Sequence, residues 1–380
     1  MAMERLFQLM LEKKASDLFV AVGSPVHLKV NGTSVPINQQ IMDNAMIASL
    51  LGEILSESDF NQLATYHELN MGFGVQGVGR FRLSAFHQRG SISCVIRFIQ
   101  NEIPALESLN LPDILSEIIM EKRGLVLLVG ATGSGKSTTI ASMLDLRNIQ
   151  RTGHILTLED PIEYVFKNKK SIVNQREIGT DTDNLHIALK NALRQAPDCI
   201  LIGEIRDKET MSASIAYAQS GHLCLATLHA NNSYHALNRI ISFYPIENRP
   251  ALLSDLSAAL RSIVSQRLIK AKSGGRLPAV EVLLNTRHIS ELIEKGEINE
   301  IKEAMEKSLS PGSQTFEQAL YRLLTDGLIT EDEALANADS PTNLLWLLNN
   351  ASPADLNRNR EPEKRKEQEG ASFTEFTLNA

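Results

Sequence analysis

The chain has 380 residues, which is too long for one ordinary domain and suits two or three. Its hydrophobic content of 43% and charged content of 22% are ordinary for a globular protein. Lys and Arg total 38 against 45 Asp and Glu, giving a net charge of -7, and only 5% of the residues are aromatic. Binding a nucleic acid requires a basic surface and, for single strands, stacking platforms. We therefore expect no nucleic-acid partner.

The cysteines and the apolar runs bear on the cellular compartment. Cys94, Cys199 and Cys224 stand far apart and form no C-x-x-C pair, so a structural zinc site has no support. A sparse, odd set of cysteines is typical of a reducing compartment. No apolar run approaches the roughly 20 residues of a membrane span, and the N-terminus does not resemble a signal peptide. These features predict a cytoplasmic chain.

Residues 1–99 are predicted to form a small α+β domain. Apolar residues at helical spacing over residues 6–11 predict a first helix. Alternating apolar residues over 26–30, followed by Asn31-Gly32, predict a hairpin. A second hairpin is predicted over residues 79–99, with its turn near Arg89-Gly90.

The pattern changes after residues 100–112, where two prolines interrupt the periodicity and predict an interdomain linker. Five apolar runs without alternation then indicate strands buried on both faces, as in a parallel sheet. These runs cover residues 125–129, 155–158, 199–202, 223–228 and 280–284. Helical stretches separate most of them, so we predict an α/β domain over residues 113–350. The charged residues 351–380 are predicted to be disordered.

One segment matches the phosphate-binding motif G-x-x-x-x-G-K-[ST] in full and continues into a predicted helix. Its residues are Gly130, Ala131, Thr132, Gly133, Ser134, Gly135, Lys136, Ser137 and Thr138. Backbone N–H groups of such a loop cradle phosphate oxygens, and the following helix N-terminus adds its positive end. We expect Lys136 to reach the β- and γ-phosphates of ATP and Ser137 to bind Mg²⁺. The alternative is a glycine-rich turn without chemistry.

Two other predicted strands end in acids. The run over residues 199–202 leads into Gly203 and Glu204, so Glu204 would contact Mg²⁺ directly or through water, although Gly203 stands where an Asp is usual. Capping the next helix is the alternative role for Glu204. The run over residues 155–158 leads into a cluster of acids that ends with Glu163. Gathered carboxylates are costly without a nearby cation, and one of them could activate the attacking water. Taken alone, this second segment could equally be a polar surface loop.

Two histidines, His222 and His229, flank the predicted strand over residues 223–228. Seven residues apart on a strand, they point to opposite faces or ends and suit no single metal site. They are either structural or phosphate-sensing.

In the order in which they occur along the chain, these four segments resemble the Walker A, Asp, atypical Walker B and His boxes of the secretion ATPase superfamily of type II and type IV systems. The similarity spans about residues 1–350 and includes the segments Ala15-Ser16-Asp17-Leu18 and Gly79-Arg80-Phe81-Arg82. It implies a PAS-like N-terminal domain over residues 1–99, a RecA-like P-loop ATPase core and a homo-hexameric ring.

The resemblance also implies roles for individual residues. Glu163 matches the catalytic base, and Glu204 matches the Walker B acid. His222 and His229 match the His-box residues. Arg82 and Arg97 resemble the family's arginine fingers, although Arg80 competes with Arg82 and ordinary solvated strand arginines are the alternative.

Comparison with the assembly, secretion and retraction members of the superfamily indicates the branch to which this sequence is most similar. Assembly and secretion members carry a four-cysteine zinc loop and a long N-terminal extension, which this sequence lacks. The chain resembles the retraction branch, the PilT/PilU family. Residues 285–296 depart from the C-terminal box of PilT-like members, which reads near AIRNLIRE. Residues 188–198, 221–232 and 314–321 look more like PilU-type members.

The resemblance implies a motor that powers or assists pilus retraction and twitching motility. Its implied partners are a PilT-like ATPase and an inner-membrane platform protein. The motor would lie at the cytoplasmic face of the inner membrane at the pilus base and reach the membrane only through those partners. The alternatives are an assembly or secretion motor, a largely accessory ring subunit, and a nucleic-acid motor, which the acidic balance disfavours.

Overall fold

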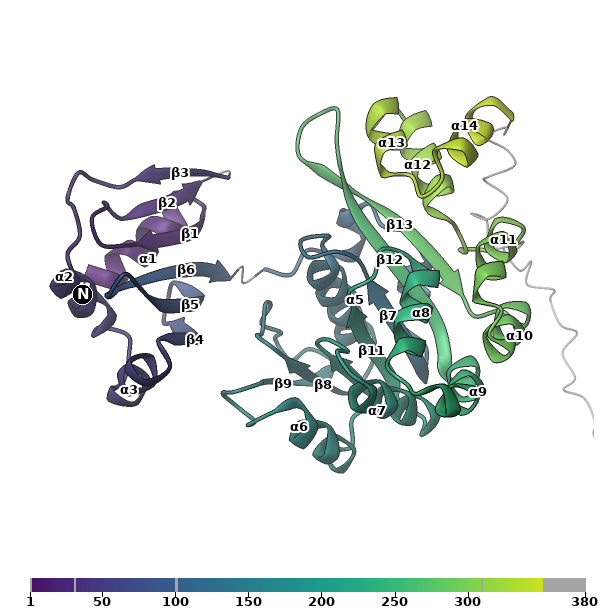
Figure 1. Cartoon of the computed structure of the whole chain (residues 1–380), viewed down its shortest axis with the longest axis horizontal. Helices are drawn as coiled ribbons and strands as arrows, with labels where there is room; N and C mark the ends of the chain where they lie inside the picture. Colours follow the sequence, from purple (N-terminus) through teal and green to yellow (C-terminus); the bar gives the residue numbers. More distant parts are fainter. Residues whose placement is uncertain (1, 31, 100–101, 309, 351–380) are drawn as a thin grey trace, which may run out of the picture. The chain divides into compact units, whose positions relative to one another are not determined.

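The structure is a computed structural model that describes residues 2–30, 32–99, 102–308 and 310–350 (Figure 1). The fold is mixed α/β. The chain forms two compact units, one of Met1–Leu109, Ile119–Leu125 and Lys136–Thr227, the other of Asn110–Ile118, Val126–Gly135 and Leu228–Ala380. The predicted disordered tail lies outside the described residues. Among the helices that are described, none is long and apolar enough to cross a membrane.

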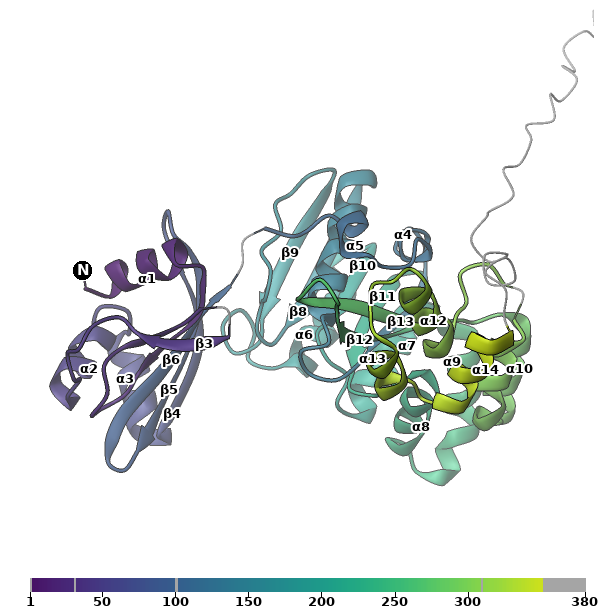
Figure 2. The ribbon, with the colours of Figure 1, turned by 90° about the horizontal axis from the view of Figure 1, so that it is seen from above.

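The first 99 residues form a six-stranded sheet with the order β3-β2-β1-β6-β5-β4. Every neighbouring pair in it is antiparallel. The strands are β1 (Ala15–Val20), β2 (His27–Val30), β3 (Thr33–Pro36), β4 (Glu68–Val75), β5 (Gly79–Gln88) and β6 (Ser91–Ile99). Three helices, α1 (Ala2–Glu12), α2 (Asn44–Leu51) and α3 (Glu57–Tyr66), pack against this sheet (Figures 1 and 2).

An apolar core lies between the sheet and these helices. Strand residues such as Leu18, Leu83 and Ile96 are fully buried in it, because successive side chains of a strand alternate between faces. The ring of Phe7 on α1 stacks on that of Phe81 on β5, with centroids 4.2 Å apart. The other face of the sheet is therefore left to the alternate residues of each strand.

Both predicted hairpins and the first helix are confirmed. The first hairpin is β2–β3, in which Val30 pairs with Thr33. The second is β5–β6, whose turn residues Arg89 and Gly90 have φ of 49° and 75°. Two positive φ values in a two-residue loop match the twist of the flanking strands. Strands β1 and β4 were not predicted; β4 contains two glycines and an asparagine, which weaken any strand signal.

A seven-stranded sheet has the order β13-β12-β7-β11-β10-β8-β9. The pairs β11–β10, β10–β8 and β8–β9 are parallel. The strands are β7 (Gly124–Val129), β8 (Gly153–Glu159), β9 (Ser171–Glu177), β10 (Cys199–Ile202), β11 (Leu223–Leu228), β12 (Leu260–Lys270) and β13 (Arg276–Leu284). Four of the five predicted apolar runs are β7, β8, β10 and β11, and each is almost wholly buried.

The fifth predicted run was placed wrongly in a parallel sheet. Residues 280–284 end β13, which pairs antiparallel with β12 over nine residue pairs from Ser262↔Leu284 to Lys270↔Arg276. The run is buried because C-terminal helices cover this hairpin, and burial alone does not reveal strand direction. Strand β12 itself was not predicted, since Ser, Gln and Arg residues interrupt its apolar side chains.

The remaining helices separate these strands or follow them. They are α4 (Ile114–Ile118), α5 (Lys136–Gln150), α6 (Leu185–Ala192), α7 (Lys208–Gln219), α8 (Ser233–Ser242), α9 (Arg249–Ala259), α10 (Arg287–Lys295), α11 (Ile301–Glu306), α12 (Phe316–Thr325), α13 (Glu331–Asn337) and α14 (Pro341–Asn350). Helices α12 to α14 pack on β12 and β13 through a core that includes Ile269, Phe316 and Leu344.

The N-terminal core yields a stability prediction. Phe7→Ala should destabilise the protein by about 3–5 kcal/mol, because it removes a fully buried ring that packs on Phe81. Leu11→Ala on the same helix is the matched control, since Leu11 is 47% exposed and should cost under about 1 kcal/mol. Urea unfolding measures both, and equal losses would contradict the assignment of the core.

Candidate functional site

The loop between β7 and α5 is built so closely against β12 that two of its positions require glycine. A Cβ at Gly130, where φ is 153°, would lie 2.5 Å from Ser134 Oγ and 2.6 Å from the Gln266 carbonyl oxygen. A Cβ at Gly135, where φ is 89°, would lie 2.7 Å from Gln266 Nε2. Real Cβ atoms do not approach so closely, so these glycines fix the loop against its neighbouring strand.

A cavity of about 280 Å³ adjoins this loop. Its lining residues are Gly130, Ala131, Thr132, Gly133, Ser134, Asn231, Gln266, Arg267, Leu268 and Arg276. The hydroxyl of Ser134 is buried and has no hydrogen-bond partner among the described residues. Buried polar groups are rarely left unpaired, so a polar ligand at the loop would account for this hydroxyl. The backbone and side-chain character of the cavity fits the phosphates of a nucleotide.

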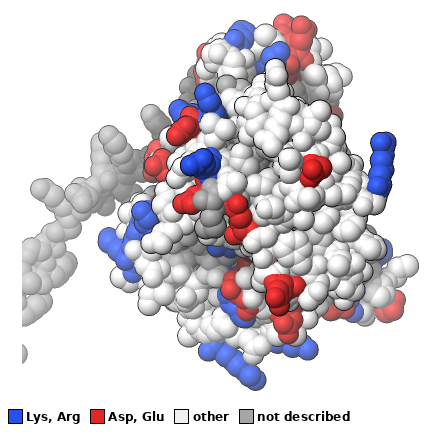
Figure 3. All heavy atoms as spheres, turned by 90° about the vertical axis from the view of Figure 1, so that its left-hand side faces the viewer, with Lys and Arg blue, Asp and Glu red and all other residues white. Residues whose placement is uncertain are grey.

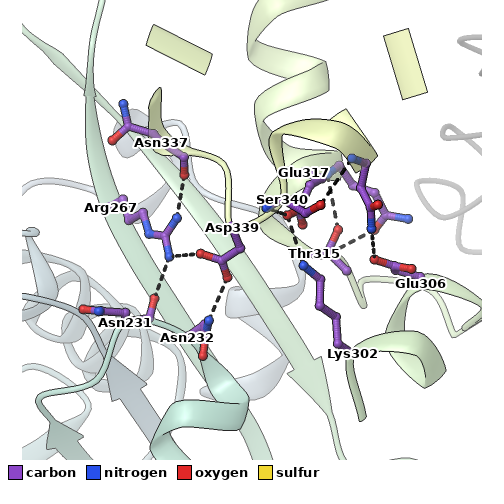
Figure 4. Close-up of polar contacts among 12 residues, drawn as sticks. Asn231, Asn232, Arg267, Lys302, Glu306, Thr315, Glu317, Asn337, Asp339 and Ser340 are labelled. Carbon is purple, nitrogen blue, oxygen red and sulfur yellow. Dashed lines mark hydrogen bonds and ion pairs between the residues drawn. The ribbon is translucent and has the colours of Figure 1, made fainter. Parts of the chain in front are cut away.

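Arg267 on β12 joins this cavity to the C-terminal helices (Figure 4). Its guanidinium donates to the carbonyl oxygens of Asn337 at 2.5 Å and Asn231 at 3.1 Å, and it is ion-paired with Asp339. It also lies 3.9 Å from the ring centroid of Phe316. The second carboxylate oxygen of Asp339 accepts from Asn232 at 2.7 Å. The group therefore ties the segment before α14 to β12 and to the start of α8.

A second network anchors the same segment. Glu317 on α12 is buried, and its Oε1 accepts from the Ser340 backbone N–H at 2.7 Å and from Lys302 Nζ at 3.2 Å (Figure 4). A buried carboxylate needs such partners to remain charged. The residues flanking Asp339 are thus held from both sides.

In the first unit, Lys136 begins α5 and lies within electrostatic reach of two predicted carboxylates. Burial lowers the pKa of Lys136, while its attraction to Glu204 and Glu163 acts in the opposite direction. The structure therefore brings together Lys136, Glu163 and Glu204, which lie far apart in the sequence. Glu163 is exposed, as a residue that meets a ligand must be.

Glu204 follows β10 and is ion-paired with Arg206, whose Nε lies 2.7 Å from Glu204 Oε2. Arg206 also reaches Asp160, at 3.6 Å. The hydrogen bond to Glu204 is the main cause of the raised pKa of Arg206. One carboxylate oxygen of Glu204 is thus occupied by Arg206.

Gly203 stands where an Asp was expected, and the packing explains why. A Cβ at this position would lie 3.0 Å from the Leu158 carbonyl oxygen and 3.3 Å from Glu159 Cα. The Gly203 N–H donates to that same carbonyl at 2.8 Å, and Thr227 Oγ1 donates to the Gly203 carbonyl. The end of β10 therefore lies so close to β8 that a side chain at Gly203 would require backbone atoms of β8 to shift.

The other acids of the 159–163 segment differ in environment. Partial burial raises the pKa of Glu159, while hydrogen bonds from Thr157 at 2.6 Å and Gln175 at 3.1 Å lower it. The Glu159 carboxylate is thus engaged by side chains of the protein itself. Tyr164 contacts α5, the helix that follows the phosphate loop, where its hydroxyl forms a hydrogen bond with Thr138 Oγ1 at 2.8 Å. Ser137, the neighbour of Thr138, is exposed.

The two histidines lie at opposite ends of β11. His222 precedes the strand, and its Nδ1 contacts Ser220 Oγ at 3.0 Å and the Tyr217 carbonyl oxygen at 3.2 Å, at the end of α7. His229 follows the strand. Glu204 follows β10, which is parallel to β11, so the amino end of β11, where His222 lies, is not the end at which Glu204 lies. The structure does not bring His222 together with the acids.

The three candidate arginines of the N-terminal sheet have different partners. Arg80 is ion-paired with the buried Glu177 at 2.9 Å. Arg97 is ion-paired through Nε with the buried Asp17 at 2.7 Å. Arg82 forms no hydrogen bond or ion pair with any residue that the structure describes. Arg80 is therefore engaged, whereas Arg82 is available to a ligand.

Sequence reasoning missed the residues that line the loop from β12. Gln266, Arg267 and Arg276 belong to no short motif, and the strand that carries Gln266 and Arg267 was not predicted. The partly buried, oppositely charged residues Arg267 and Asp339 lie 72 positions apart in the sequence. The one available signal was the polar residues inside an otherwise apolar strand.

A complete phosphate loop after a buried strand, with a lysine facing two carboxylates, defines a P-loop nucleotide-binding protein. The sequence profile described as "Type II/IV secretion system protein" matches residues 2–275. The chain belongs to this family and is an ATPase.

Known relatives narrow the branch. The type IV pilus ATPase PilU of Pseudomonas aeruginosa is 48% identical over 356 residues, covering 93% of this chain and 93% of the relative. The type IV pilus retraction ATPase PilT of the same organism is 38% identical over 329 residues, covering 87% and 96%. The crystal structure of the pilus retraction motor PilT with bound ADP matches with a TM-score of 0.85 and 39% identity, over 90% of this chain and 98% of that one. The chain is thus similar to the pilus retraction ATPases, and more so to PilU than to PilT of that organism, as its sequence predicted.

The close packing at Gly203 can be tested directly. Gly203→Ala should destabilise the protein by about 1–3 kcal/mol, because the new Cβ meets backbone atoms of β8 that cannot move freely. Gly74→Ala is the matched control, since nothing lies within 4 Å of a Cβ there. Calorimetric unfolding compares the two variants, and an unchanged Gly203→Ala would show that β10 and β8 have room for a side chain.

Proposed function

We propose that this chain hydrolyses ATP as a hexameric motor of the type IV pilus system, and that it powers or assists pilus retraction and twitching motility. The observation that carries this proposal is the approach of Lys136 to both Glu163 and Glu204 beside a complete phosphate loop. The similarity to PilU and PilT supports the biological context. The proposed fold is a RecA-like core that follows a PAS-like N-terminal domain.

The proposed nucleotide site divides its work among the residues predicted from the sequence. Backbone N–H groups over residues 130–138 bind the phosphates, and Lys136 neutralises charge on the β- and γ-phosphates. Glu163 orients and deprotonates the attacking water. We propose that His229, which follows the carboxyl end of β11, contacts the phosphates and that His222, at the amino end, has a structural role.

Mg²⁺ would be held by the Ser137 hydroxyl and the Glu204 carboxylate. Mg²⁺ commonly binds through one or two protein oxygens, substrate phosphates and waters, so two protein ligands would suffice. When bound, the ion would supply neutralising charge to the phosphates.

Arg82 and Arg97 are proposed to act as arginine fingers that neutralise charge on the transferring phosphoryl group of the bound nucleotide. Support comes from the engagement of Arg80 by Glu177 and from the lack of any partner for Arg82 among the described residues. We further propose a PilT-like ATPase and an inner-membrane platform protein as partners, at the cytoplasmic face of the inner membrane.

Lys136→Ala should lower ATP turnover at least about 10²-fold, because the phosphates lose their fixed cation. Lys122→Ala, which removes an exposed lysine before β7, should leave turnover unchanged. Steady-state phosphate release measures both variants. In cells, Lys136→Ala should change pilus number and reduce twitching; wild-type values for both, with and without a PilT-like partner, would remove the retraction assignment while leaving the ATPase intact.

Glu163→Gln should bind ATP as the wild type does but hydrolyse it about 10²–10⁴-fold more slowly, because the amide cannot accept the proton of the water. Glu159→Gln is the matched control, since the Glu159 carboxylate is already hydrogen-bonded by Thr157 and Gln175. Nucleotide binding by fluorescence and turnover by phosphate release separate the two effects. If Glu159→Gln hydrolysed ATP more slowly than Glu163→Gln, the catalytic base would be Glu159.

A further inference from the structure

Exposed carboxylates are common on this protein, so exposure alone does not distinguish Glu163 as a catalytic base. Figure 3 shows acidic side chains interspersed with basic ones over the face in view, with wide uncharged areas between them. An exposed side chain on an unrestrained backbone samples several orientations, whereas a general base must stay within hydrogen-bond reach of the proton that it accepts. Efficient catalysis by Glu163 therefore requires that the backbone around it is held.

Glu163 lies in an irregular segment, residues 160–170, that connects β8 to β9. The backbone N–H and C=O groups of such a segment have no partners in a sheet ladder, so they bind elsewhere. Strand β9 is an edge strand of the seven-stranded sheet, and its side chains supply several of these partners. Gln175 and Glu177 lie on the same side of β9, because successive side chains of a strand alternate between faces.

Glu177 anchors the segment on the N-terminal side of Glu163. Its Oε2 accepts from the Ile162 backbone N–H at 3.1 Å and from Arg80 at 2.9 Å. The Glu177 side chain is only 4% exposed, and the ion pair with Arg80 compensates the burial of its charge. The residue that precedes Glu163 is therefore tied to β9.

On the C-terminal side of Glu163, a single amide group binds the backbone at two points. Gln175 Nε2 donates to the Tyr164 carbonyl oxygen at 2.7 Å, and Gln175 Oε1 accepts from the Phe166 N–H at 2.9 Å. Nε2 also donates to Glu159 Oε1 at 3.1 Å. A carbonyl oxygen can only accept and an N–H can only donate, so these contacts fix the orientation of the amide. A carboxylate of the same shape offers no donor to the Tyr164 carbonyl oxygen.

A second amide makes the same kind of contact farther along the segment. Asn148 on α5 donates from Nδ2 to the Lys167 carbonyl oxygen at 2.8 Å and accepts at Oδ1 from the Lys169 N–H at 3.1 Å. Each amide thus bridges a carbonyl oxygen and the N–H two residues later. Gln175 does so directly after Glu163, whereas Asn148 bridges residues farther from it. The two amides therefore form a matched pair that differs in distance from the proposed base.

We propose that Gln175 is a positioning residue for ATP hydrolysis, which holds the backbone that follows Glu163 so that the Glu163 carboxylate stays within reach of the attacking water. This inference rests on the proposed function of Glu163 as the base. Glu177 holds the preceding residue, and Gln175 supplies the second fixed point, without which the segment can shift about the first. Gln175 touches neither the nucleotide nor the water, and its effect passes through Glu163.

The first test compares ATP turnover of full-length Gln175→Leu and Asn148→Leu. Both substitutions remove an amide that bridges two backbone groups, so both should lower the midpoint of urea unfolding. Only Gln175→Leu should also lower kcat, by about 10–10²-fold, with KM for ATP changed less than about twofold, because the base is misplaced while nucleotide binding is kept. Wild-type kcat in Gln175→Leu, or an equal loss of kcat in Asn148→Leu, would overturn the proposal.

Gln175→Glu keeps the test decisive if Gln175→Leu does not fold. The carboxylate has the shape of the amide and still accepts from the Phe166 N–H, but it cannot donate to the Tyr164 carbonyl oxygen and it stands beside the Glu159 carboxylate. Its kcat should fall about 10–10²-fold as well. Asn148→Asp makes the corresponding change at the other amide and should keep kcat within about twofold. Gln175→Glu with the kcat of the wild type would contradict the proposal.

A double variant separates positioning from a general loss of structure. If Gln175 acts only through Glu163, Gln175→Leu should cause less than about a twofold further loss of kcat in the Glu163→Gln protein, in which the base is already removed. If Gln175→Leu lowered kcat by the same factor in both backgrounds, its effect would not pass through Glu163, and the positioning role would be excluded.

The same variants distinguish this inference from the proposed function beneath it. Wild-type kcat in Glu163→Gln would remove Glu163 as the base, and the role of Gln175 would fall with it. A slow Glu163→Gln beside a fully active Gln175→Leu would remove the role of Gln175 alone and leave Glu163 as the base.

Discussion

The close approach of the phosphate loop to β12 is the constraint on which the nucleotide site depends. Gly130 and Gly135 leave no room for a Cβ between the loop and Gln266, so the loop is pressed against a strand that lies more than 100 residues later in the sequence. A loop held in this way presents its backbone N–H groups in one arrangement before any ligand arrives. Such preorganisation is what makes fixed dipoles effective in binding phosphate.

The same strand, β12, also connects the phosphate loop to the C-terminal helices. Gln266 contacts the loop, and the next residue, Arg267, binds Asp339 and the carbonyl oxygens of Asn231 and Asn337. The loop, the start of α8 and the segment before α14 therefore share one strand as their support. A shift of the C-terminal helices would be felt at the cavity beside the loop, because neighbouring residues of a strand cannot move independently.

Ion pairs between an arginine and a carboxylate fix side chains in both the N-terminal sheet and the seven-stranded sheet. Glu204 is held by Arg206, Asp17 by Arg97 and Asp339 by Arg267, and in the last two pairs a poorly exposed carboxylate fixes an arginine. Arg267 and Arg97 differ in whether their terminal nitrogens are bound by the protein. Both terminal nitrogens of Arg267 are bound to protein oxygens, which suits a structural tie, whereas those of Arg97 form no hydrogen bond with the described residues, which suits contact with an anion.

The sequence by itself determined the phosphate-loop motif, both N-terminal hairpins and the family, because each is written in a short, continuous stretch. It also singled out Glu163 and Glu204 as candidate acids of the site. It also identified four of the five buried strands by their unbroken apolar runs. The tertiary structure decided the rest: the antiparallel direction of β13, the packing reason for Gly203, and the separation of His222 from the acids. It also decided the partners of each arginine. These depend on which distant strands become neighbours, and spacing along the chain carries no information on contacts between residues as far apart as Asp17 and Arg97.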